Sequence, residues 1–75
     1  MLNKLEVELL ITQCNSYIAQ HRSVVQCYTT ALDQHYGVLD SDTRNRMVST
    51  INASNHMLTA LEDLRIRATL TLGNL

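Results

Sequence analysis

Proline, tryptophan and phenylalanine are absent from the 75 residues, and only two glycines are present. β-Rich domains and loop-rich disulfide scaffolds need many turn-forming residues, so this composition disfavours both classes. Long α-helices, by contrast, tolerate few glycines and no interior proline. We therefore expect an all-α protein that folds as one domain over residues 1–75, with a small core.

A strong charge of one sign and long apolar runs are also missing. The formal net charge is −1 and the six basic residues are dispersed, which argues against nucleic-acid binding. Glu6 and Glu8 interrupt the apolar segment near the start, and Arg65 and Arg67 interrupt the one over 64–72. Neither a signal peptide nor a membrane span is expected, so a cytoplasmic protein without membrane contact is the resulting expectation.

The two cysteines do not predict a disulfide. Cys14 and Cys27 fall on one expected helix, about 20 Å apart along its axis. A disulfide joins Cα atoms no more than about 7 Å apart, so that helix excludes an intrachain bridge. Buried structural thiols are expected at both positions.

A long first helix is indicated by a cap and by heptad spacing. Asn3 and Glu6 have the spacing of a capping box, in which each side chain accepts a hydrogen bond from the backbone of the other. Three neighbouring columns of largely apolar residues follow with a seven-residue step, which predicts a helix over residues 3–36. The columns are Val7, Cys14, His21, Tyr28 and His35; Leu10, Tyr17, Val24 and Ala31; and Ile11, Ile18, Val25 and Leu32.

A turn and a second helix complete the pattern. Gly37 is expected to end the first helix in the left-handed conformation, and Asp40 or Ser41 to cap a helix over 42–72 that stops at Gly73. A short connection brings long helices back antiparallel, so the predicted fold is an antiparallel two-helix hairpin. Residues whose numbers sum to about 79 should then face each other. The second helix carries Met47, Ile51, Ser54, Leu58, Leu61, Arg65, Ala68 and Leu72 on its stripe.

Apolar side chains exceed what such a hairpin can bury. Each helix has one neighbour, so part of a wide apolar stripe stays in water, and a partner is expected to cover it. Apolar residues off the stripe gather at the end away from the turn, which predicts a contiguous partner-binding surface there. The alternative, that they cover the termini or are single exposed residues, stays open. The predicted partner-binding residues are Leu2, Leu5, Leu9, Ile66 and Leu70, with Leu75 just beyond.

Catalytic and metal-binding patterns are not found. The three histidines lack the i, i+3 or i, i+4 spacing of a helical metal site, and a two-helix hairpin offers no concave pocket for a nucleophile and its base. No enzyme, metal or cofactor is expected. The tyrosines are expected to pack in the core, with a role in an interface as the alternative if the hairpin docks on a partner. Glu62–Arg65 and Asp63–Arg67 are expected to form surface ion pairs.

Several segments resemble a known family. The opening Leu5-Glu6 followed by Leu9-Leu10, the Gly-Val-Leu-Asp turn at 37–40 and the Leu58 to Glu62 stretch resemble the small helical-hairpin co-chaperones of bacterial type III secretion needle subunits. Thr-Arg-Asn-Arg at 43–46 departs from it, because some members have Gln-Tyr near the start of helix two. The resemblance implies a bacterial cytoplasmic protein that pairs with and stabilises a tetratricopeptide-like chaperone, keeping the needle subunit soluble before export. From the residues alone, the alternative is a self-assembling hairpin that dimerises into a four-helix bundle through its apolar stripe.

Overall fold

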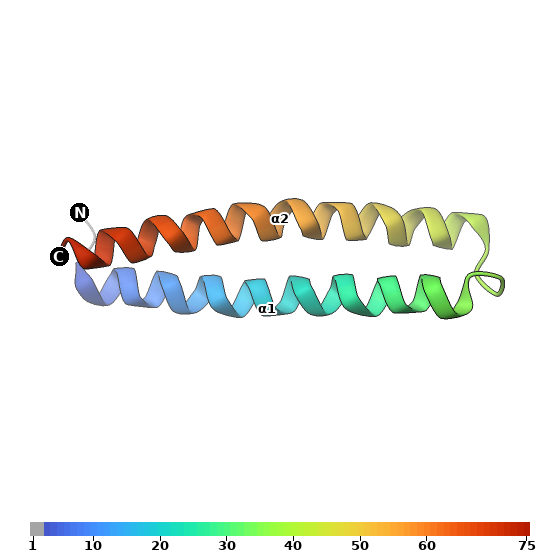
Figure 1. The fold of residues 1–75 in the computed structure, drawn as a ribbon, viewed down its shortest axis with the longest axis horizontal. Helices are drawn as coiled ribbons and strands as arrows, with labels where there is room; N and C mark the ends of the chain where they lie inside the picture. Colours follow the sequence, from blue (N-terminus) through green and yellow to red (C-terminus); the bar gives the residue numbers. More distant parts are fainter. Residues whose placement is uncertain (1–2) are drawn as a thin grey trace.

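Two antiparallel helices joined by a short turn make up the computed structural model, which describes residues 3–75 (Figure 1). Helix α1 spans Lys4–His35 and helix α2 spans Ser41–Gly73. They lie side by side in a rod of 53 × 14 × 13 Å. The predicted all-α hairpin is confirmed, and each helix boundary lies one residue from its expected place. Below, the open end is the one where α1 begins and α2 ends, and the turn end is the opposite one.

Both helices begin at side-chain caps. The Asn3 carboxamide oxygen accepts the Glu6 N–H at 2.9 Å, and the Glu6 carboxylate accepts the Asn3 N–H at 3.3 Å, so the predicted capping box is present. At α2 the Asp40 carboxylate accepts the Thr43 N–H at 2.7 Å, which makes Asp40 the cap. These acceptors satisfy N–H groups that have no partner within a helix.

The left-handed cap predicted at Gly37 is wrong. Neither glycine has a positive φ, and Gly73 is the last residue of α2, followed by Asn74 in a right-handed conformation. At the turn, the N–H groups of Val38 and Leu39 both donate to the His35 carbonyl, at 3.0 and 3.2 Å.

The side chain of Arg44 makes several contacts within the turn. Its guanidinium donates to the carbonyl oxygens of Tyr36 at 3.0 Å and Leu39 at 2.9 Å, and it lies 4.3 Å from the centre of the Tyr36 ring. A third contact reaches the Ser41 hydroxyl at 3.3 Å. This one side chain thus satisfies two carbonyls of the turn that have no partner within α1 or α2.

The core is small and lies toward the open end. Its buried apolar side chains are Val7, Cys14, Ile18 and Ala68. Ser54 is also buried, and its hydroxyl lies 3.4 Å from Nδ1 of His21. Arg65 donates to the Asn15 carboxamide at 3.1 Å, and these residue numbers sum to 80, so the predicted pairing of the helices is confirmed.

Several side chains expected inside are outside. Cys14 is buried as predicted but Cys27 is exposed, and Tyr17, Tyr28 and Tyr36 are all exposed rather than core residues. The reason is the single neighbour of each helix, which covers one column of side chains and leaves much of the flanking columns in water.

One of the two expected ion pairs also differs. Glu62 pairs across the hairpin with Arg22 at 2.9 Å, not with Arg65 on its own helix. Arg65 instead reaches Asn15 on α1. The Asp63–Arg67 pair forms as predicted, at 2.9 Å.

Candidate protein-binding surfaces

The predicted partner-binding residues that the structure describes are all exposed at the open end. Leu5 and Leu70 are 64% and 65% exposed, and Leu9 and Ile66 are each more than half exposed. Leu75 is exposed as well. Leu2 lies outside the described residues. Their exposure makes them available to a partner, and their binding role stays a prediction.

These side chains do not form one surface. Leu5 and Leu9 stand two positions before and after Val7, which is buried against α2. At about 100° per residue, both point about 160° away from Val7, toward the outer side of α1.

Ile66 and Leu70 have the same relation to a buried residue of α2. They stand two positions before and after Ala68, so they lie on the outer side of that helix. The predicted contiguous surface is therefore wrong: the outer apolar pairs, Leu5–Leu9 and Ile66–Leu70, share one end of the rod but face in opposite directions.

The two long sides of the rod between the helices differ in polarity. On one side, which we call the Arg22 side, Arg22 pairs with Glu62 and Arg65 donates to Asn15. Asn15 and Arg22 are one heptad apart, so both point to the same side of α1. Two polar contacts between side chains therefore join α1 to α2 along the Arg22 side.

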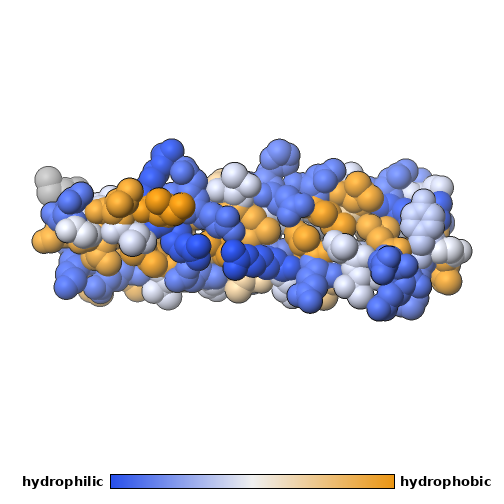
Figure 2. Space-filling model, in the orientation of Figure 1, coloured by the Kyte–Doolittle hydropathy of each residue, from blue (hydrophilic) through white to orange (hydrophobic). Residues whose placement is uncertain are grey.

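The opposite side, called the Tyr17 side, is apolar and open. It carries Leu10 and Tyr17 from α1 and Met57 and Leu64 from α2. Tyr17, Met57 and Leu64 are exposed. Among residues 3–75, no hydrogen bond or ion pair between side chains crosses from α1 to α2 on this side. Figure 2 shows one face of the rod, on which apolar atoms reach the surface at many points among polar ones.

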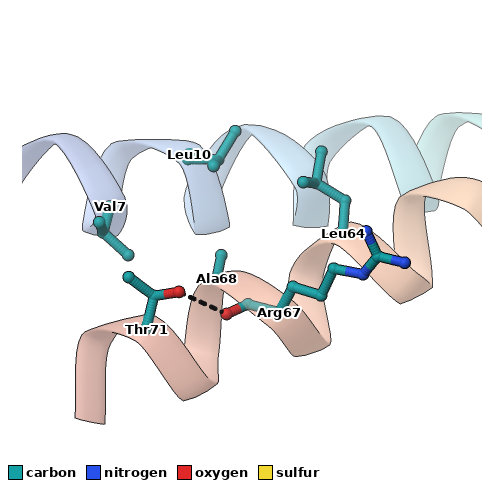
Figure 3. A pocket seen from close by; sticks show the side chains of 6 residues that line it. All are labelled: Val7, Leu10, Leu64, Arg67, Ala68 and Thr71. Atoms are coloured by element: carbon teal, nitrogen blue, oxygen red, sulfur yellow. Dashed lines mark hydrogen bonds between the residues drawn. The ribbon is translucent and has the colours of Figure 1, made fainter. Parts of the chain in front are cut away.

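A hollow of about 160 Å³ indents the Tyr17 side near the open end. In Figure 3, Val7 from α1 and Ala68 from α2 point toward each other across it. The Thr71 hydroxyl donates to the Arg67 carbonyl at 2.9 Å, so this polar group is satisfied within its own helix. An apolar cavity of about 150 Å³ holds a benzene-sized group, so the hollow suits one large apolar side chain. It is lined by Val7, Leu10, Leu64, Arg67, Ala68 and Thr71.

Neither a metal-binding cluster nor a membrane-crossing helix is present in the part of the chain that the structure describes. Residues 3–75 hold no group of three or more His, Cys, Asp or Glu side chains that could bind a metal ion. Neither α1 nor α2 is long and apolar enough to cross a membrane.

No protein-family model, curated protein or solved structure matches this chain.

Proposed function

We propose that this chain is a protein-binding hairpin whose open end is held by a larger all-helical partner, as in a type III secretion co-chaperone. The observation that carries the proposal is the placement of the outer apolar pairs. Both are exposed at the same end of the rod. Burying a leucine or isoleucine side chain contributes about 1.5–3 kcal/mol, so a partner that covers four of them gains substantial affinity.

The opposite directions of the two pairs favour a concave partner. A flat surface reaches only one outer side of the rod, whereas a groove that receives the open end contacts both. Helical-repeat proteins present extended concave surfaces of this kind. The family resemblance implies a partner of that class, a tetratricopeptide-like chaperone that also holds the secretion needle subunit.

The proposed work takes place in the bacterial cytoplasm before export. There the hairpin covers apolar surface of its chaperone, and binding stabilises both folded chains by mass action. The chaperone then keeps the self-assembling needle subunit soluble. A second copy of this chain is the alternative partner, which would make the protein a self-assembling structural hairpin.

The test is co-expression with candidate tetratricopeptide-like chaperones from neighbouring genes. We expect a 1:1 complex by size-exclusion chromatography with light scattering. The double variant Leu5→Asp/Leu9→Asp should weaken that complex at least about a hundredfold, because two apolar contacts are lost and two charges are added at the interface. Far-UV circular dichroism should show its helicity retained.

A matched control lies one heptad along the same outer side of α1. Thr12 and Ser16 are exposed, so Thr12→Asp/Ser16→Asp adds the same charges to the same side without removing an apolar pair. We expect this control to keep the complex. The proposal fails if the unaltered chain does not bind, or if both double variants weaken binding equally. A needle-subunit gene nearby would support the proposal, and a phage or plasmid context would count against it.

A further inference from the structure

We propose that a second copy of this chain packs on the Tyr17 side, so that two hairpins form a four-helix bundle. This proposal specifies the surface through which a second copy, the alternative partner named above, would bind. It does not depend on the secretion role, because it uses a different surface from the outer apolar pairs.

Polarity selects the Tyr17 side over the Arg22 side. Burying the Arg22 side would remove the Arg22–Glu62 pair and the Arg65 guanidinium from water, which is costly for charged groups. The Tyr17 side is bordered along its middle by uncharged residues, and its charged residues, Glu6, Arg46 and Arg67, stand toward the ends. Two copies can therefore meet along the middle without like-charge repulsion. The uncharged bordering residues are Gln13, Gln20 and Cys27 on α1 and Ala53 and Ala60 on α2.

The exposed side chains have the chemistry of an interface between helices. Tyrosine and methionine are enriched in protein interfaces, and Tyr17 and Met57 are both about half exposed here. No side chain of residues 3–75 fills the hollow beside Leu10 and Leu64. In a four-helix bundle, side chains of one helix pair enter the spaces of the other, which would fill such a hollow.

The area of the side fits a second full-length copy. A side of 53 by 14 Å spans about 740 Å². Stable protein interfaces bury about 800 Å² on each partner, so only an occupant that covers the whole length supplies the usual area. A second hairpin has that length, and it would add a second layer to a core of four buried apolar side chains.

The experiment compares two exposed positions on opposite sides of α2. Met57, 48% exposed, is one heptad from Leu64 on the Tyr17 side, whereas Val48, 46% exposed, is two heptads from Glu62 on the Arg22 side. Sedimentation equilibrium of the purified chain from about 1 to 100 μM should show a dimer. Met57→Glu should raise its dissociation constant at least about thirtyfold, because both copies bury a new charge, and Val48→Glu should change it less than about threefold.

Circular dichroism of each variant, and a second pair of variants, distinguish a weaker dimer from a lost fold. Met57→Ala and Val48→Ala add no charge, and only Met57→Ala should weaken the dimer.

A monomer at the highest concentration, or equal effects at the two positions, overturns the proposal. Leu5→Asp/Leu9→Asp should keep the dimer while losing the chaperone, so failure of one proposal is distinguishable from failure of the other. Loss of the dimer in that variant would show that the outer apolar pairs, not the Tyr17 side, join the copies.

Discussion

The open half and the turn half of the rod are stabilised by different interactions. Every buried side chain in residues 3–75 lies in the open half or at its inner limit, Ser54, whereas none between residues 19 and 53 is buried. The turn half instead has local polar contacts, made by the Asp40 cap and by Arg44 with the carbonyls of the turn. Among residues 3–75, fully buried apolar side chains are therefore confined to the open half, whereas polar contacts are found in both halves and hold the turn.

The central column of α1 explains the difference. It holds Val7 and Cys14 in the open half, where small side chains allow complete burial. Farther along, the same column holds His21, which is only partly buried, and then Tyr28 and His35, whose larger, polar-tipped side chains extend toward water. An unbroken heptad pattern thus does not imply an evenly packed interface, because side-chain size along the central column decides how much is buried.

The largest expected effect on the free energy of unfolding comes from comparing two positions in one column of α1. Ile18 is buried in the open half, and Leu32, two heptads along, is only partly buried in the turn half. Ile18→Ala should lower the free energy of unfolding by about 2–4 kcal/mol, and Leu32→Ala by about half of that or less. Urea unfolding followed by circular dichroism at a fixed protein concentration measures both. Equal losses would show that the two halves are equally packed.

A smaller effect is expected at Arg44, which joins the turn to α2. Arg44→Ala should lower the free energy of unfolding by about 1–2 kcal/mol, because two carbonyls lose a charged donor and the Tyr36 ring loses its cation. Arg44→Lys should recover less than half of the loss, since an ammonium lacks the planar fork. The nearby exposed Arg46 is the control: Arg46→Ala should change stability by less than about 0.5 kcal/mol. A similar loss of stability at both positions would show that the contacts of Arg44 do not stabilise the turn.

The smallest effect is a pH dependence at the α2 cap. Hydrogen bonds from Thr43 hold the pKa of the Asp40 carboxyl below its ordinary value of 3.8, and the charge of Arg44 acts in the same direction. Since the pKa is lower in the folded chain, the stabilisation is complete well above 3.8 and is lost as pH falls through the lowered value. Asp40→Asn keeps a capping side chain but removes the ionisation. Its acid unfolding curve should therefore be flatter than that of the unaltered chain between about pH 5 and 2, and identical curves would contradict this account.

Local signals made most of the fold predictable. The Asn3–Glu6 capping box, the heptad columns and the cap and glycine signals at 37, 40 and 73 depend on neighbours within one or two turns. Together they place every helix boundary within one residue. The glycine rule failed at Gly37, where the N–H groups of Val38 and Leu39 donate to the His35 carbonyl instead. The carbonyls of the turn are contacted by Arg44, a side chain of the following helix. Nothing in the glycine or its neighbours indicates that contact.

The candidate surfaces were only partly predictable. The sequence showed that the outer apolar pairs lie off the stripe. That they face in opposite directions follows from their spacing around Val7 and Ala68, but only when these two residues are known to be buried. The polarity of the two long sides could not be predicted in this way. Arg22 and Glu62 have numbers that sum to 84, five above the predicted pairing, because long side chains reach past the residue directly opposite.

The thinness of the rod has a consequence for how it opens. With cross-sectional extents of 14 and 13 Å, each layer of side chains contacts only the layers before and after it. Stability in such a chain is close to a sum of neighbouring layers, as in linear repeat proteins. Opening can then begin at the turn end while the layers around Val7 and Ala68 stay packed. The molecule thus has a gradient of protection along its length, with the most persistent structure at the end that carries the outer apolar pairs.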